Sequence, residues 1–309
     1  MKKDIIIGAA VNYMAKDLYN FVLSLRKNYK ANVLFFVSNN IDEETLNFFD
    51  KYKIHYEKTT QNTKEIFKKR YYLYLNYLKK NKFDRVMITD TRDVIFQKNP
   101  FNNTKFSNLC FFSEDKKIEE CIYNSNWIIN LYGKKQFETI KNNKIICSGT
   151  TIGKYKDIIY YLKVICKEIE NTNNSKIAKD LRKSFSIKTF IGKSLKSIVG
   201  NKYYSFLKHK VYKGYTYVGT DQGNHNYLIY FQKIKKFKIL SNKDGYVCTF
   251  GNADVKKYKV NNGVSNSEGL KFNILHQYDR IYKKNSKYFN NSFKKKFIKY
   301  IKNSNLLNF

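Results

Sequence analysis

Proline is almost absent from this chain. Pro100 is the only one in 309 residues, and no stretch rich in glycine, proline or serine interrupts the sequence. Such stretches are typical of flexible linkers, so their absence favours one domain with additions over two separate domains. With 42% apolar residues, a chain of this length can fill a substantial core.

Cysteine is scarce and follows no pattern. The five cysteines include no C-x-x-C pair and no regular spacing: Cys110, Cys121, Cys147, Cys166 and Cys248. Zinc sites and disulfide frameworks both need regular spacing. We therefore expect neither, and expect reduced thiols that are mostly buried.

Long apolar runs are missing as well. No stretch approaches the roughly 20 apolar residues that a membrane-spanning helix needs. The run from Ile5 to Val11 is too short, and has the wrong flanks, for a signal peptide. These absences predict a cytoplasmic protein, with peripheral attachment to the inner face of a membrane left open.

Acidic residues are few beside basic ones. The 59 Lys and Arg against 25 Asp and Glu give a formal net charge of +34, which attracts phosphates, anionic lipid or acidic polysaccharide. An A/T-rich coding sequence would also explain much of this excess, because Lys, Asn, Ile and Tyr are all abundant. Nucleic-acid binding is an alternative, given 27 Tyr and 24 Phe. The spread of basic residues over the whole chain and the lack of a recognition motif disfavour it.

The first hundred residues alternate between strands and helices. Apolar runs and helical spacing predict, in chain order, strand 5–11, helix 16–27, strand 33–37, helix 43–52, strand 53–57, helix 63–80 and strand 85–89. This alternation predicts right-handed crossovers and a parallel sheet. Neither G-x-G-x-x-G nor G-x-x-x-x-G-K occurs, so phosphates would have to be held by other means.

The remainder has shorter strands and two basic segments. Strands are predicted at 109–112, 145–147 and 236–240, residues 155–213 form a helical basic insertion, and 285–309 is a basic amphipathic tail. The tail suits an interfacial helix on anionic lipid, or a helix whose aromatic residues join the core while its lysines stay in solvent. We divide the chain into a domain of residues 1–284, with halves 1–101 and 102–284, and the tail.

The most informative segment runs from Val86 to Phe96, where an apolar strand leads directly into Asp90 and Asp93. Carboxylates at the carboxyl end of a buried strand are costly unless a cation or hydrogen bonds satisfy them, and open α/β sheets bind ligands at that end. A divalent metal is the simplest explanation. The alternative is a tight turn capped by the two aspartates and neutralised by Arg92.

The order of the motifs along the chain is familiar. The acidic motif is followed by Val-Ile-Phe-Gln-Lys-Asn-Pro-Phe, then by a Ser-Gly-Thr strand, an Asp-Gln-Gly-x-x-Asn helix start and a late histidine, His276. This order resembles the GT-A class of nucleotide-sugar glycosyltransferases over roughly residues 4–282, and the Asp-Gln segment resembles its retaining family-eight enzymes. The chain departs from the usual Asp-x-Asp signature, because two residues separate Asp90 from Asp93.

The resemblance implies a fold and an activity. The fold is α/β: a GT-A (Rossmann-like) mixed sheet with helices on both faces, with residues 1–101 as its nucleotide-binding half and 102–284 as its acceptor and catalytic half. The activity is metal-dependent hexosyl transfer, with retention, from a nucleotide-diphosphate sugar (UDP-sugar favoured) to a glycan or glycolipid acceptor in surface-glycan synthesis. A sugar nucleotidyltransferase of similar fold is disfavoured, since residues 8–12 lack the glycine-rich basic loop usual in those enzymes.

The implied cofactor is Mn²⁺ or Mg²⁺, held by Asp90, Asp93 and His276. Hard carboxylate oxygens suit both ions, an imidazole favours Mn²⁺, and the ion stabilises the charge on the departing diphosphate. Taken alone, His276 is better explained as a core or surface residue than as a ligand, and it is the resemblance to retaining GT-A families that favours ligation. Arg92 would orient the two aspartates, or form a surface salt bridge.

The other site residues follow from the same resemblance. Those expected to bind the donor are Ala10, Asn12, Tyr13, Arg70, Asp90, Arg92, Ser148, Gly149 and Thr150, with the Tyr13 ring stacking on the base and residues 148–150 forming a turn that the sugar approaches closely. The alternative for residues 148–150 is an ordinary tight turn, and the alternative for Arg70 is a solvated run of charged residues. Asp221 and Gln222 are expected beside the anomeric carbon, or Thr220 or Asp221 simply caps a helix.

Overall fold

The computed structural model describes residues 3–62, 65–102, 108–174, 220–281, 291–304 and 306. Contacts divide the chain into two compact units. Unit 1 consists of Met1–Asp115, Ile146–Leu162 and Lys235–Phe309, and unit 2 of Lys116–Ile145 and Lys163–Ile234. The acidic motif and the late histidine both belong to unit 1.

The first part of unit 1 alternates strands with helices, as the sequence predicts. Its elements are β1 (Asp4–Ala10), α1 (Ala15–Asn28), β2 (Asn32–Ser38), α2 (Glu43–Lys51), β3 (His55–Thr59), α3 (Ile66–Lys80) and β4 (Arg85–Thr89). The third strand lies two residues later than predicted, because Lys53 takes a left-handed conformation and Ile54 ends the turn. All the other strands and helices lie within a few residues of their expected bounds.

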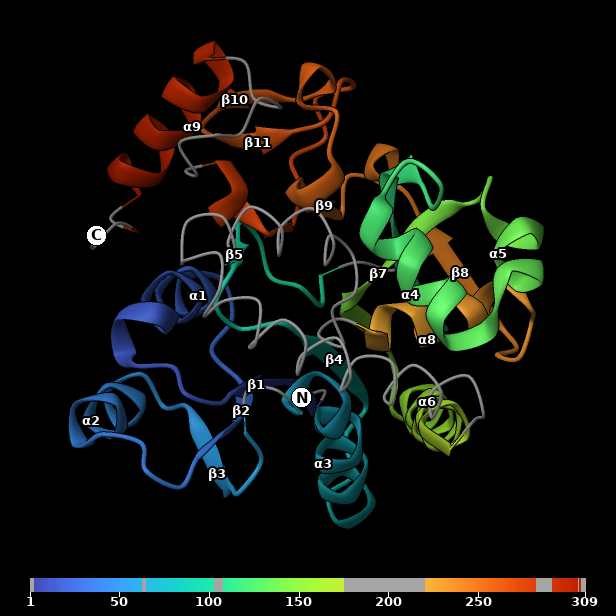
Figure 1. Cartoon of the computed structure of the whole chain (residues 1–309). Helices are drawn as coiled ribbons and strands as arrows, with labels where there is room; N and C mark the ends of the chain where they lie inside the picture. Colours follow the sequence, from blue (N-terminus) through green and yellow to red (C-terminus); the bar gives the residue numbers. More distant parts are fainter. Residues whose placement is uncertain are drawn as a thin grey trace, which may run out of the picture. The chain divides into compact units, whose positions relative to one another are not determined.

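A seven-stranded mixed sheet organises unit 1 (Figure 1). It is completed by β6 (Leu109–Lys117), β7 (Lys144–Lys154) and β8 (Phe237–Leu240), and its order is β3-β2-β1-β4-β7-β6-β8. Strands β1 to β4 pair in parallel, whereas β7 runs antiparallel to β4. The mixed α/β class expected from the sequence is therefore present.

Helices cover both faces of this sheet. On one face Phe21 of α1 packs edge-on against Phe35 of β2, and Phe35 packs against Phe49 of α2. On the other face Phe36 contacts Tyr74 of α3. Alternate residues of β2 thus enter two different cores, which explains why the strand is apolar throughout rather than alternating.

A second, smaller sheet lies in the C-terminal part of unit 1. It contains β5 (Val94–Phe96), β9 (Val247–Thr249) and β12 (Ile274–His276), in the order β5-β12-β9. A hairpin of β10 (Lys259–Asn261) and β11 (Gly263–Ser265) and the helix α9 (Asn291–Asn303) complete this part. Helix α1 holds β5 in place, because Ser24 Oγ accepts the backbone N–H of Phe96 at 3.0 Å.

The tail helix α9 packs its apolar face into this core. Phe293, Phe297 and Ile301 are buried, and the Phe297 ring lies 5.6 Å from that of Phe250. Lys295, Lys296, Lys299 and Lys302 are exposed. Of the two interpretations of the tail, core packing with solvated lysines is the one observed for these residues.

Unit 2 is built from helices. It contains α4 (Ile122–Tyr132), α5 (Lys134–Ile140), α8 (Thr220–Tyr230) and the C-terminal part of α6 (Tyr155–Asn174). Asn224 of α8 donates hydrogen bonds to Tyr132 of α4 and Thr172 of α6, and the Tyr132 and Tyr227 rings stack 3.7 Å apart. Helix α6 accounts for the start of the predicted insertion 155–213; residues 175–213 lie outside the described residues.

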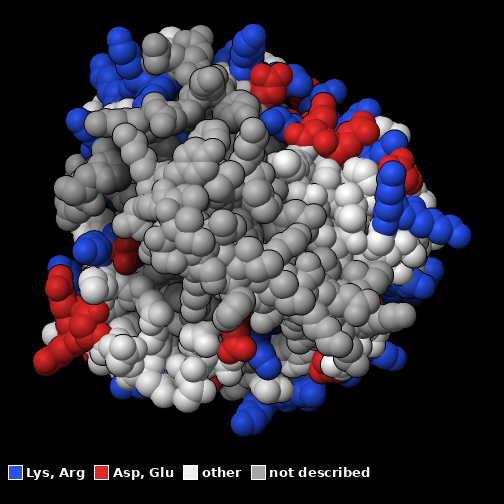
Figure 2. Space-filling model, in the orientation of Figure 1, with Lys and Arg blue, Asp and Glu red and all other residues white. Residues whose placement is uncertain are grey.

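Basic side chains occur at many separate places around the visible face (Figure 2). None of the helices among the described residues is long and apolar enough to cross a membrane.

Candidate metal centre

The acidic motif lies where the strand order of the main sheet reverses. Strand β1 has β2 on one side and β4 on the other, and the crevice outside the carboxyl ends of two such strands is the usual ligand site of open α/β sheets. Asp90 directly follows β4. The loop is tied to β1 by a 2.9 Å hydrogen bond from Thr91 Oγ1 to the carbonyl of Ala9.

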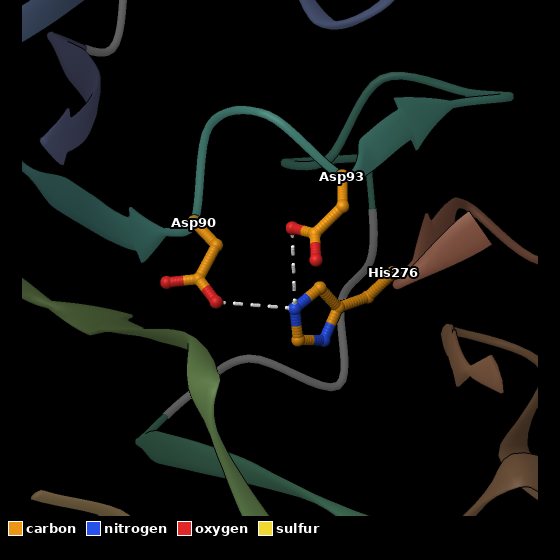
Figure 3. A group of neighbouring side chains, drawn as sticks. All are labelled: Asp90, Asp93 and His276. Carbon is orange, nitrogen blue, oxygen red and sulfur yellow. Dashed lines mark hydrogen bonds and ion pairs between the residues drawn. The ribbon is translucent and has the colours of Figure 1, made fainter. Parts of the chain in front are cut away.

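The small sheet brings the histidine to this loop. Strand β12 pairs antiparallel with β5, and His276 stands opposite Val94. Asp93 immediately precedes Val94, so the pairing register sets the imidazole beside its carboxylate. In Figure 3 the carboxyl groups of Asp90 and Asp93 both point at the same ring nitrogen of His276.

The distances suit one divalent cation. His276 Nε2 lies 3.2 Å from Asp90 Oδ2 and 3.8 Å from Asp93 Oδ1, and one ligand atom from each residue can be chosen so that all three lie within 4.8 Å of one another. In an octahedral site with bonds of about 2.1 Å, neighbouring ligand atoms are about 3 Å apart and opposite ones about 4.2 Å. The two distances to His276 fall between these values, and the 4.8 Å limit for the set lies above the larger one.

Gly149 leaves space at the same point. A Cβ atom added there would lie 2.6 Å from Asp90 Oδ2 and 2.7 Å from His276 Nε2. The Gly149 carbonyl also accepts the backbone N–H of Asp90 at 2.9 Å. A glycine is therefore required where the two ligand atoms converge, and the residues present fit a bound cation.

Arg70 of α3 orients the Asp90 carboxylate. Its guanidinium forms an ion pair with Asp90 Oδ1, which leaves Oδ2 directed at His276. The sequence-based assignment put Arg70 beside the nucleotide; in the structure its ion-pair partner is the aspartate. Arg92, which was expected to orient the aspartates, instead pairs with Asp279 at 3.4 Å.

The protonation of the three ligands follows from their surroundings. Burial alone would raise the pKa of Asp90, but the Arg70 charge and the His276 hydrogen bond lower it below its usual range. Burial raises the pKa of Asp93. Burial alone would lower the pKa of His276, but the hydrogen bond to Asp90 and the charge of Asp93 raise it above its usual value. In the metal-free protein this raised pKa favours the doubly protonated imidazolium form of His276, and a cation would displace one of its two ring protons.

The residues after β1 lie close to the acidic loop. Asn12 has a positive φ of 59° and its backbone N–H donates to Ser38 Oγ at 2.7 Å, which shapes the turn after Ala10. The Arg92 guanidinium lies 5.9 Å from the centre of the Tyr13 ring. Tyr13 and Arg92, two of the expected donor-binding residues, are thus neighbours at the ends of β1 and β4.

The predicted turn at residues 148–150 is wrong. These residues lie in the middle of β7, where Thr150 pairs with Thr89 of β4. A strand is favoured because the segment is buried on both faces and its backbone groups are satisfied by β4. Successive side chains alternate, so Gly149 faces Asp90 and His276 while Ser148 and Thr150 face the other way.

Asp221 and Gln222 belong to unit 2. Both lie in the first turn of α8, and Asp221 is buried, a position that favours a carboxylate through the helix dipole. Gln222 Nε2 donates to Asn124 Oδ1 of α4 at 2.8 Å.

Two residues that sequence reasoning assigned no role contact the histidine. Cys147 Sγ and Thr249 Oγ1 each lie 3.4 Å from His276 Nδ1. Burial raises the pKa of Cys147, which keeps it a neutral thiol. Three strands meet at this point, and their contact leaves no local pattern in the sequence.

Neither a family model nor a curated protein matches this chain.

Proposed function

We propose that the chain is a metal-dependent glycosyltransferase that transfers a sugar from a nucleotide-diphosphate donor to a hydroxyl group of a surface-glycan or glycolipid acceptor. The observation that carries the proposal is the convergence of Asp90, Asp93 and His276 on one point at the strand-order reversal of the sheet. The seven-stranded mixed sheet with helices on both faces is compatible with the GT-A fold that the sequence resembles.

The ligand set fits the chemistry of such a donor. Two carboxylates and an imidazole suit Mn²⁺, with Mg²⁺ as the other candidate, and the bound ion would stabilise negative charge on the departing diphosphate. Arg70 keeps Asp90 ionised and oriented. Tyr13, beside Arg92, offers a ring for a nucleobase, and we favour a UDP-sugar.

Transfer makes a bond from the acceptor oxygen to the anomeric carbon and breaks the bond from that carbon to the diphosphate, which leaves with the electron pair. The acceptor hydroxyl must also lose its proton. We assign the acceptor side to Asp221 and Gln222 of unit 2, and retention as the stereochemical outcome. Synthesis on a lipid-linked acceptor would fit a peripheral location at the inner face of a membrane.

A thermal-shift screen of the full chain tests the function. UDP, GDP and CMP are added with and without Mn²⁺, and Asp93→Asn serves as the metal-site control. We expect UDP to raise the melting temperature only when Mn²⁺ is present, by about 5 °C at a hundredfold excess over Kd. If no nucleotide shifts the wild type with Mn²⁺, and no nucleotide sugar is hydrolysed, the proposal is wrong.

Asp221→Asn tests the acceptor side. An amide still hydrogen-bonds but neither accepts a proton nor carries charge, so we expect nucleotide binding to persist while transfer falls by about 10²–10⁴-fold. A loss of nucleotide binding together with a lower melting temperature would mean that Asp221 only stabilises the start of helix α8 and has no role in transfer.

A further inference from the structure

The two ring nitrogens of His276 face different surroundings. Nε2 faces the carboxylates of Asp90 and Asp93, whereas Nδ1 faces Cys147 Sγ and Thr249 Oγ1, each at 3.4 Å. The imidazole is fully buried, and both Nδ1 neighbours are almost so. The ring is therefore held between a metal-ligand side and a second, uncharged side.

The strand geometry explains how both neighbours reach Nδ1. Thr249 stands opposite His276 in the parallel pair of β9 and β12. Cys147 lies two residues before Gly149 on β7, and residues two apart point to the same face of a strand. The face of β7 that makes room for a cation at Gly149 thus also supplies the sulfur at the far side of the ring.

An imidazole that binds a cation through Nε2 must carry its proton on Nδ1. A buried N–H without an acceptor is costly, and metal-binding histidines regularly donate this proton to a fixed partner. At 3.4 Å the oxygen of Thr249 is beyond the usual 2.7–3.2 Å range for N–H···O. Sulfur is a larger atom, so Cys147 at the same distance is the better placed acceptor.

We propose that Cys147 and Thr249 are positioning residues: Cys147 accepts the Nδ1–H of His276, Thr249 is a weaker second acceptor, and together they aim Nε2 at the cation. The inference rests on the metal site of the proposed function. It excludes Cys147 as a metal ligand, because its sulfur contacts Nδ1, the ring nitrogen that faces away from the carboxylates.

Metal titration of full-length variants tests the proposal. Calorimetry with Mn²⁺ alone is applied to the wild type, Cys147→Ala, Thr249→Val and the double variant. We expect Kd to rise by about 10- to 100-fold in the double variant, with a larger share from Cys147→Ala, and Thr249→Ser to bind like the wild type. Equal Kd values in the wild type and the double variant would overturn the proposal.

Thr151→Val is the matched control. Thr151 is a buried threonine on β7 whose hydroxyl has no hydrogen-bond partner among the described residues, so the substitution removes a buried hydroxyl that forms no hydrogen bond with His276. We expect its Kd for Mn²⁺ to stay within about twofold of the wild type, well short of the loss expected for a lost histidine partner. A rise as large as that of the double variant would mean that any change on these strands weakens the site, and would contradict a specific role.

A measurement without metal separates this proposal from the proposed function. The imidazole Nδ1–H of His276 should give a slowly exchanging proton resonance in the metal-free protein, identified by its absence from His276→Asn. We expect this resonance to persist in Thr151→Val and to exchange rapidly in the double variant. The wild type could fail to bind Mn²⁺ while its Nδ1–H resonance exchanges rapidly only in the double variant. That result would confirm the hydrogen bond and show that the proposed metal-dependent function is wrong. If the double variant keeps the resonance, Cys147 and Thr249 are not its acceptors.

Discussion

Gly149 lies directly against His276: a Cβ atom at residue 149 would be 2.5 Å from His276 Cε1. Strand β7 thus closes one side of the candidate metal centre with backbone rather than with a side chain. The absence of a single carbon atom leaves the space in which the ligand atoms of two distant segments converge.

Gly149→Ala should therefore remove Mn²⁺ binding, because the new methyl group would occupy the space beside Asp90 Oδ2 and His276 Nε2. We expect Kd to rise by at least about 100-fold, the upper end of the range for indirect effects on a metal site. Gly153→Ala is the control on the same strand, since its Cβ would meet Leu109 instead. Calorimetry that finds unchanged binding in Gly149→Ala would contradict the site.

Asp90→Asn and Asp93→Asn should both abolish metal binding but differ in their effect on stability. Asp90 neutralises the largely buried Arg70, so its loss should lower the free energy of unfolding by about 2 kcal/mol. Among the described residues Asp93 forms an ion pair with His276 but with no Lys or Arg side chain, and burial opposes its charge. Denaturant unfolding of the metal-free proteins should therefore show Asp93→Asn at least as stable as the wild type.

Metal affinity should rise with pH. The pKa of His276 is raised well above its usual value, so a cation must displace a proton, and affinity should increase by up to tenfold per pH unit until that raised pKa is passed. Titration calorimetry in buffers of different ionisation enthalpy should show about one proton released per Mn²⁺ bound.

The contribution of His276 to the stability of the metal-free protein should fall as the pH rises. A raised pKa in the folded state adds stability that is complete below the ordinary histidine value of about 6.5 and is lost as pH rises through the raised pKa. The difference in melting temperature between the wild type and His276→Gln, measured with chelator, should therefore shrink with rising pH. A constant difference would contradict the raised pKa.

The tail helix should be needed for stability. Phe297 is fully buried against Phe250, so Phe297→Ala should cost about 3–5 kcal/mol in the free energy of unfolding. Lys299→Ala, at an exposed position of the same helix, should change it by less than about 0.5 kcal/mol. Equal unfolding curves for Phe297→Ala and the wild type would mean that α9 does not contribute to the core.

Any binding to an anionic membrane should be electrostatic rather than insertional. Phe293, Phe297 and Ile301 of α9 are buried, and the four lysines at positions 295, 296, 299 and 302 are exposed. Replacing these four by glutamine should abolish flotation with anionic vesicles, and wild-type flotation should fall with salt. The control replaces four exposed lysines elsewhere in unit 1: Lys51, Lys53, Lys79 and Lys80. If both sets of replacements reduce flotation equally, membrane binding depends on the net charge of the protein and not on α9.

Local patterns were sufficient for the strands and helices of the first hundred residues, because apolar periodicity records which faces are buried. They also identified Asp90 and Asp93, since two carboxylates after an apolar strand are costly wherever the chain folds. The long strand β7 was missed beyond Cys147, because Ser148, Gly149 and Thr150 carry no apolar signal although the sheet buries them.

Tertiary structure alone decided the partners within the site. The pairing of Arg70 with Asp90, the register of β12 against β5, and the contacts of Cys147 and Thr249 with His276 all join segments that are far apart in the chain. Strand register depends on the whole set of packed side chains rather than on any one segment. For this reason a single sequence predicts which residues are chemically capable of holding a cation, while only the folded chain sets their distances.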